Sequence, residues 1–245
     1  MKINILSGAL ATAYLILCSA LYLWVFWLYF DINILQFIDS SDIIKAAALP
    51  AIPVITFSLV HFAIQQYNIS TTEQRTEFRE AGGFFKVFSY VQLIYLIIVI
   101  AIGLLAFGYM VYIFFTGTLP KKYSSFAFLA GSILSYFLIN KDSFLEDWGK
   151  ARVIAILSIC YLPTYMMQSG IQEAEKIISG KDTYLISSNL SCSKNEKDKY
   201  RYIATLSDKI FSISLTDNSI CIQHYEFLSL SKEKDALPLT GLVIK

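Results

Sequence analysis

Three long runs without a formal charge constrain the fold of this chain more than any other feature of its sequence. They lie between Lys2 and Asp31, between Lys45 and Glu73, and between Lys86 and Lys121, and they contain 28, 27 and 34 residues. A helix needs about 20 mostly apolar residues to cross the hydrocarbon core of a bilayer. Each run is therefore expected to contain a membrane span, at about 5–30, 46–64 and 87–115. The first run exceeds the apolar segment of a cleavable leader, which has about 7–15 residues, so we interpret it as a span.

Two shorter apolar segments leave the number of spans open. We expect residues 124–140 to form a fourth span. Residues 153–168 form either a helix that is buried in the bundle or lies at the membrane surface, or a fifth span. The segment Val153–Met167 is apolar on every face, whereas a helix at a membrane surface has one polar face. The fifth span therefore remains an alternative.

The distribution of Lys and Arg favours four spans with both termini in the cytoplasm, because short cytoplasmic loops are enriched in these residues. With four spans and a cytoplasmic N-terminus, nine basic residues of the region 2–181 lie inside and three lie outside. The nine are Lys2, Arg75, Arg79, Lys86, Lys141, Lys150, Arg152, Lys176 and Lys181, and the three are Lys45, Lys121 and Lys122. A fifth span moves Lys176 and Lys181 outside, which changes the balance to seven against five.

The C-terminal part of the chain has a different character. Residues 173–245 hold ten of the 20 Lys and Arg residues. The segment GIQEAEKIISGKD predicts an amphipathic exit helix that ends at Gly180, because its apolar residues follow helical spacing and glycine favours the C-cap conformation. The segments YRYIATL, KIFSISL and SICIQHYEF predict strands that are separated by turn-rich residues, and TYLISS adds a candidate fourth strand. In KIFSISL, Phe211, Ile213 and Leu215 alternate with serines, which predicts one buried face.

The predicted fold class is therefore an α-helical polytopic membrane protein with a small C-terminal antiparallel β domain. Residues 1–170 are expected to form the helical bundle, and residues 171–245 the exit helix and a small cytoplasmic β domain. A sheet of about 50 residues is too small for a large core of its own. It is therefore expected to pack on the membrane part, on a second copy of the chain or on a partner.

Few residues suggest chemistry. Apart from tyrosines and Cys18, the three long runs contain one ionisable side chain, that of His61, and the carboxylate partner typical of a proton relay is missing. Two histidines and four cysteines show no spacing typical of metal ligands, and no nucleotide-binding or hydrolase motif occurs. We therefore predict no enzymatic activity, no catalytic residue, no metal site and no cofactor. A net charge of +1 also argues against direct binding of nucleic acid.

Two groups of acidic or cysteine residues are expected to have no catalytic role. Asp142, Glu146 and Asp147 lie among lysines, as in a solvated loop, and are not interpreted as a catalytic cluster. Cys192 and Cys221 are expected to be free thiols in a cytoplasmic tail, and to pair only if the tail faces an oxidising compartment.

Two regions are candidate partner-binding surfaces. A short charged helix is expected at about 71–81, where Ser70 and Glu73 have capping-box spacing, and an exposed strand edge is expected near 219–227. Such an edge can accept a strand from another protein. The candidate partner-binding residues are Glu73, Arg75, Phe78, Arg79, Ser219, Ile222, His224 and Tyr225.

Two further patterns concern the membrane part. Ala127, Gly131 and Ser135 repeat small residues on one face of the fourth span, which favours close packing of helices within the bundle or between subunits. Trp24, Trp27 and Tyr29 lie at the end of the first span, where aromatic side chains typically form a belt at the level of the lipid headgroups.

The four spans, the charged elbow, the exit helix GIQEAEKIISGKDTYLI and the short β tail together resemble the membrane subunit of the Kiwa anti-phage defence system. The resemblance concerns the architecture and residues 171–228. It implies a multi-pass protein of the bacterial inner membrane, a homo-oligomer (a tetramer), and a soluble cytosolic effector as partner.

The function expected from these patterns is that of a non-enzymatic scaffold or sensor in the lipid bilayer, which oligomerises and recruits a cytosolic effector. Two alternatives remain: an oligomeric channel or pore, and a superinfection-exclusion or immunity protein that acts alone.

Overall fold

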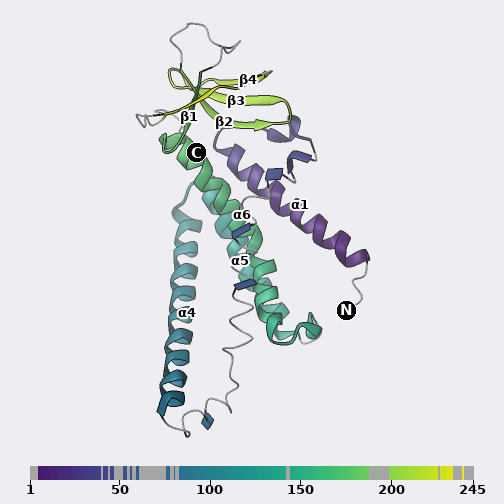
Figure 1. The fold of residues 1–245 in the computed structure, drawn as a ribbon, viewed down its shortest axis with the longest axis vertical. Coiled ribbons are helices and arrows are strands. Elements are labelled where there is room, and N and C mark those ends of the chain that lie inside the picture. The colour runs from purple at the N-terminus through teal and green to yellow at the C-terminus, as the bar shows by residue number, and fades with distance from the viewer. Residues whose placement is uncertain are drawn as a thin grey trace. The chain divides into compact units, whose positions relative to one another are not determined.

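The computed structural model describes residues 5–39, 41–43, 45–46, 52–53, 56, 59–60, 76–77, 80, 83–141, 144–187, 192, 199–225, 227–233 and 239. Within these residues, four helices are long and apolar enough to cross a membrane (Figure 1). They are α1 (Ile5–Leu28), α4 (Gly83–Thr116), α5 (Leu119–Asn140) and α6 (Arg152–Ser179). Long apolar helices followed by a small sheet are the architecture expected from the sequence. The span expected at 46–64 and the helix expected at 71–81 lie largely outside the described residues.

One continuous helix occupies the region where two were expected. The segment 153–168 and the exit helix both belong to α6, which has 28 residues and contains Pro163. At 1.5 Å per residue this helix is about 42 Å long, which exceeds the roughly 30 Å of a hydrocarbon core. The segment that we expected to be buried or interfacial is therefore part of a helix that is long and apolar enough to cross.

The chain forms two compact units, and their division differs from the boundary expected at residue 170. Unit 1 comprises Met1–Pro50, Thr118–Pro120 and Tyr165–Lys245, and unit 2 comprises Ala51–Gly117 and Lys121–Thr164. The first helix thus belongs to the same unit as the sheet, and α6 contributes its first half to unit 2 and its second half to unit 1.

Unit 1 contains a five-stranded antiparallel sheet with the strand order β4-β3-β2-β1-β5 (Figure 1). The strands are β1 (Tyr184–Ile186), β2 (Tyr200–Leu206), β3 (Lys209–Ser214), β4 (Ile220–His224) and β5 (Leu230–Lys232). Both β2 and β4 join β3 through short turns, in which Ser207 and Asn218 take positive φ. The prediction of a small antiparallel sheet is confirmed, but β5 was missed because its three residues show no clear alternation.

The predicted buried face of β3 is confirmed, and the face that carries the serines is covered as well. Phe211 and Ile213 are buried, as expected, but Ser212 and Ser214 are buried as well. The Ser212 hydroxyl donates to the Cys221 carbonyl oxygen at 3.4 Å, and the Ser214 hydroxyl accepts from two backbone N–H groups of the following turn. Small polar side chains that satisfy the backbone can be buried at little cost, so the alternation of serines did not mark a solvent face.

Unit 2 packs α5 against the first half of α6 through a glycine. A Cβ at Gly131 would lie 2.6 Å from the Cys160 carbonyl oxygen. Next to this contact, the Ser132 and Tyr161 hydroxyls are 2.9 Å apart, and the Phe128 and Tyr161 rings are 5.1 Å apart. The small-residue face of α5 therefore meets a helix of the same chain at Gly131, while Ser135 is buried and Ala127 is partly exposed.

Arg152 closes the C-terminal end of α5. Its guanidinium donates hydrogen bonds to the carbonyl oxygens of Leu138, Ile139, Lys141 and Phe144, at 2.6 to 3.1 Å. The last carbonyl groups of a helix have no partner within the helix and carry partial negative charge. A cation in this position both satisfies and stabilises them.

The helix α4 exposes apolar side chains over most of its length. Its buried residues are Ser89, Gln92 and Ile113, and no residue of its most apolar 18-residue stretch is buried. A water-exposed helix of a soluble protein would have a polar face. The surface of α4 is therefore what a helix surrounded by lipid presents.

We expect Gly131→Ala to destabilise unit 2, because the added methyl group would collide with backbone atoms of α6. Overpacking of this kind typically costs about 1–3 kcal/mol. Gly108→Ala in α4 is the matched control, because a Cβ there meets no described atom within 4 Å. Thermal unfolding of the detergent-solubilised protein should show a lower Tm for Gly131→Ala and an unchanged Tm for Gly108→Ala. Equal values for the two variants would contradict the tight contact.

Candidate functional site

The second half of α6 runs parallel to α1 within unit 1. A Cβ at Gly170 would lie 2.7 Å from the Tyr22 carbonyl oxygen, so glycine permits a close approach of the two helices. Further along both helices, the Tyr29 hydroxyl lies 3.3 Å from the Glu175 carboxylate. From the Gly170–Tyr22 contact to the Glu175–Tyr29 contact, the residue numbers of both helices increase, so the helices are parallel. The C-terminal ends of α1 and α6 therefore lie together, and both ends reach the sheet.

A buried ion pair joins the end of α6 to the sheet. The Arg201 side chain on β2 has no exposed surface, and its guanidinium lies 2.6 and 2.8 Å from the two carboxylate oxygens of Glu233, which is also buried. The same guanidinium donates to the Ile177 carbonyl oxygen at 2.9 Å. Two parallel bonds to a carboxylate are the strongest geometry available to arginine. Arg201 thus connects β2, the end of β5 and the last turn of α6.

The last turn of α6 is closed by backbone groups as well. Gly180 has a φ of 73°, its N–H donates to the Ile177 carbonyl oxygen at 3.2 Å, and the Lys181 N–H donates to the Lys176 carbonyl oxygen at 3.1 Å. This is the Schellman arrangement, which usually requires glycine. Leu239 N–H donates to the Ile178 carbonyl oxygen at 3.0 Å. The predicted end of the helix at Gly180 is confirmed.

Aromatic side chains join the end of α1 to β3. The Trp27 and Phe211 rings are 4.7 Å apart, and Phe37 approaches Phe211 from the other side with a centroid distance of 5.8 Å. Trp27, Phe30 and Phe211 are almost fully buried. Aromatic pairs at these distances contribute about 0.5–1.5 kcal/mol beyond the burial of their surface. The sheet therefore packs on the end of α1 as well as on the end of α6.

The segment that follows α1 also contacts the sheet. The Ser207 hydroxyl, in the turn between β2 and β3, donates to the Asp42 carboxylate. Burial works to raise the pKa of Asp42, but hydrogen bonds from the Ser207 hydroxyl and from backbone N–H groups of Asp39 and Ser207, with the charge of Lys45, outweigh it. The pKa of Asp42 is lowered from its ordinary value of 3.8.

A cavity of about 570 Å³ lies where these elements meet. Its volume is within the range of about 300–1,000 Å³ that is usual for small-molecule sites. The described residues that line it come from the last two turns of α1, from residues 45–46, from α6 and from β2. They are Tyr22, Leu23, Phe26, Trp27, Lys45, Ala46, Ser169, Gln172, Glu173, Lys176, Tyr202, Ile203, Ala204, Thr205 and Leu206. We call it the α1–α6–β2 cavity.

The walls of this cavity are of two kinds. Leu23, Phe26 and Ile203 provide apolar surface, whereas Lys45, Glu173 and Lys176 carry charge. The Lys176 ammonium lies 3.1 Å from the Glu173 carboxylate, and about half of each side chain is exposed. An exposed pair of this kind contributes little to stability, so its partners can turn to a ligand at low cost.

One polar atom at the cavity is buried without a partner. Trp27 is 1% exposed, and its indole Nε1 has no hydrogen-bond acceptor among the described residues. A buried N–H group without an acceptor costs about 1–3 kcal/mol, and such groups are uncommon in folded proteins.

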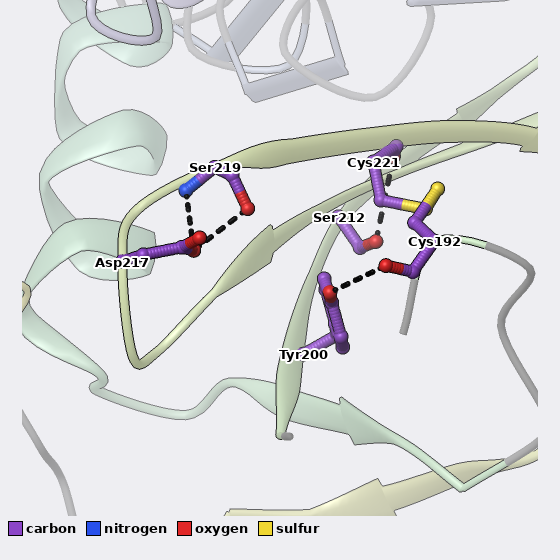
Figure 2. The surroundings of a disulfide bond; sticks show 6 residues. All are labelled: Cys192, Tyr200, Ser212, Asp217, Ser219 and Cys221. Atoms are coloured by element: carbon purple, nitrogen blue, oxygen red, sulfur yellow. Dashed lines mark hydrogen bonds between the residues drawn. A yellow bond between two sulfur atoms is a disulfide. The ribbon is translucent and has the colours of Figure 1, made fainter. Parts of the chain in front are cut away.

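Cys192 and Cys221 form a disulfide, so the expectation of two free thiols is wrong. The bond fixes Cys192 to β4, and Figure 2 shows Tyr200 and Ser212 beside it. The Tyr200 hydroxyl donates to the Cys192 carbonyl oxygen at 3.2 Å. The pairing joins positions 29 apart in sequence, and it could be predicted only with knowledge of the compartment and of the sheet register.

The predicted partner-binding residues are only partly described. Glu73, Arg75, Phe78 and Arg79 lie outside the described residues, and so does His61. On β4, which is an edge strand of the described sheet, Ile222 pairs with Phe211. Ser219 donates to Asp217 at 2.7 Å and His224 lies 2.8 Å from Asp208, while Tyr225 is partly buried.

The aromatic residues expected in the membrane belt have different positions. Trp24 is 39% exposed, as a belt residue would be, whereas Trp27 and Tyr29 are buried against the sheet and α6. A belt places aromatic rings against lipid. The two buried residues instead pack where the ends of α1 and α6 meet the sheet, because the sheet covers this end of α1. We call this contact of the two helix ends with the sheet the joint.

Several residues of the joint were not singled out from the sequence: Lys45, Glu173, Lys176, Arg201, Tyr202 and Glu233. Arg201 is the one with a usable signal, because it lies in the otherwise apolar strand segment YRYIATL. A charge that alternates with buried positions of a strand implies a buried partner. The partner, Glu233, is 32 residues away, and no local pattern identifies it.

Comparison of the chain with models of protein families, with curated proteins and with solved structures finds no match. The part of the chain that the structure describes also contains no group of three His, Cys, Asp or Glu residues that could hold a metal ion. What the protein does has to be inferred from the arrangement of its own residues.

We expect Arg201→Met to destabilise unit 1 by about 3–5 kcal/mol, because it leaves Glu233 buried and unpaired. The double variant Arg201→Met, Glu233→Leu should lose less than the two single variants together, because neither charge then remains. Lys232→Ala is the control: Lys232 pairs with Asp182 at 2.9 Å, but both side chains are exposed. Chemical unfolding followed by far-ultraviolet circular dichroism measures each change. A loss for Arg201→Met as small as for Lys232→Ala would contradict the role of the pair.

We also expect Asp42 to make unit 1 acid-sensitive. A lowered pKa means that the carboxylate stabilises the folded state fully above the ordinary value of 3.8. This stabilisation is lost as the pH falls through the folded-state pKa. Asp42→Asn should therefore have a lower Tm than the unmodified protein at pH 7, and the difference should shrink below about pH 4. An Asp208→Asn variant is the exposed control, and a difference in Tm that does not depend on pH would contradict the assignment.

Proposed function

We propose that this protein is a non-enzymatic membrane scaffold or sensor that presents its sheet on the extracytoplasmic side of the plasma membrane. The observation that carries this proposal is the joint itself. Two helices that are long enough to cross the membrane run parallel and end at the same sheet. If both cross, the start of α1 and the sheet lie on opposite sides of the bilayer.

The disulfide favours the outer side for the sheet. Disulfides persist in oxidising compartments and are rare in the cytosol. A cytoplasmic N-terminus with an external sheet requires an odd number of crossings. With α1 and α6 directed outwards, α5 inwards and α4 outwards, one further crossing is needed between α1 and α4, where the sequence has the apolar run at 46–64. This is the five-span arrangement, which still leaves seven basic residues inside against five outside.

In this arrangement the two candidate partner surfaces lie on opposite sides of the membrane. The charged elbow with Glu73, Arg75, Phe78 and Arg79 faces the cytoplasm, where it is available to a soluble effector. The edge strand β4 and the α1–α6–β2 cavity face outwards. A sensor needs such a division, with a receiving surface outside and a docking surface inside. The effector, the oligomer and a role in anti-phage defence rest on the resemblance described above and stay predictions.

Thiol labelling in intact spheroplasts tests the position of the sheet. We expect a membrane-impermeant maleimide to label Cys192 and Cys221 only after treatment with an impermeant reductant, because the two thiols are paired and accessible from outside. The variant Cys192→Ser, Cys221→Ser is the control for labelling of Cys18 and Cys160, which are buried in helices. Labelling without reductant, and only in inverted vesicles, would place the sheet in the cytoplasm and overturn the proposal.

A further inference from the structure

We infer that the α1–α6–β2 cavity binds the anionic, phosphate-bearing headgroup of a membrane phospholipid. This inference rests on the proposed membrane location of α1 and α6, and it adds a ligand class to that proposal.

The position of the cavity along α1 fits a headgroup. Its lining residues on α1 are residues 22–27, and the helix ends at Leu28. At 1.5 Å per residue, residue 22 lies about 9 Å from the end of the helix. The headgroup layer on each side of a bilayer is about 5–8 Å thick, since the whole membrane is about 40–45 Å and the hydrocarbon core about 30 Å. The α1 wall therefore extends from the headgroup layer to the edge of the hydrocarbon.

The two kinds of wall fit an amphipathic ligand. Leu23, Phe26 and Ile203 provide apolar surface that would contact the first carbon atoms of the acyl chains. The polar lining consists of the charged and amide side chains of Lys45 and α6 and of hydroxyl side chains from α1, α6 and β2. A small water-soluble metabolite would leave the apolar surface in contact with water, which is unfavourable.

The charged side chains that line the cavity favour a phosphate group in the ligand. Lys45 and Lys176 are the cations that line the cavity, and Glu173 is the anion, so the lining has one net positive charge. Lys176 pairs with Glu173 at 3.1 Å, and that pair is exposed and weak. The ammonium can therefore turn to a phosphate oxygen, and lysine is a common phosphate ligand. An anionic headgroup such as phosphatidylglycerol matches this balance better than a zwitterionic one.

Ligand titration of the full-length protein tests this inference. The protein is purified in an uncharged maltoside detergent and delipidated until phosphorus analysis shows no bound phospholipid. It is then titrated with short-chain phosphatidylglycerol, with phosphatidylcholine of the same chain length, with glycerol 3-phosphate and with inorganic phosphate. Binding is measured from the increase in Tm and from retained ligand in native mass spectrometry.

We expect phosphatidylglycerol to bind at least about tenfold more tightly than phosphatidylcholine, and the variant Lys45→Gln, Lys176→Gln to lose about tenfold in affinity, the change that one charge-assisted hydrogen bond supplies. Lys181→Gln is the matched control, because Lys181 is exposed just beyond α6 and does not line the cavity. Both lysines of the double variant are solvent-accessible, so the variant should fold and retain its disulfide.

Each other outcome overturns the inference. Equal affinity for glycerol 3-phosphate or inorganic phosphate would identify a water-soluble ligand. Equal affinity of phosphatidylglycerol for both lysine variants would place the lipid elsewhere on the protein, and a lack of binding to the delipidated protein would exclude the headgroup. If the protein sediments with membranes and labels from outside but binds no lipid selectively, only this inference fails. If it is absent from membranes, the proposed function fails first.

Discussion

The buried guanidinium of Arg201 is the interaction on which unit 1 depends. A charge without access to water is tolerated only when its partners are in place. Here they come from two places outside β2: the carboxylate of Glu233 after β5, and carbonyl oxygens at the end of α6. The strand that carries Arg201 is the third of five in the sheet. Removing any partner would leave an unpaired group inside the protein, so the sheet and the end of α6 stabilise each other.

Arginine has the same task at the end of α5. Arg152 donates hydrogen bonds to four carbonyl groups there. At the end of α6, Arg201 shares this role with the backbone N–H groups of Gly180 and Leu239. Apolar helices lack side chains that could close their own ends, and planar guanidinium groups can reach several carbonyl oxygens at once. Arg152 therefore has a structural reason to be where it is, and its charge is weaker evidence for a cytoplasmic loop than a simple count of basic residues assumes.

The joint between helices and sheet links packing to the proposed function. The Trp27–Phe211 contact and the Arg201–Glu233 pair hold the sheet on two parallel helices, and the α1–α6–β2 cavity lies between the same elements. An occupant of this cavity would contact α1, α6 and β2 at once.

Long apolar runs, turn residues and the glycine at position 180 determined the helices, the sheet class and the end of α6, because these features depend on local periodicity and backbone conformation. The sequence alone also excluded recognised catalytic motifs. It did not determine the Cys192–Cys221 pair, the burial of Ser212 and Ser214, or the joint of Arg201 with Glu233, since these contacts join residues that are distant along the chain. The direction of α1 relative to α6 was likewise decided by tertiary structure. A count of basic residues treats each loop separately and cannot show which helix ends are neighbours. The close contact at Gly170 and the shared sheet bring the ends of α1 and α6 together.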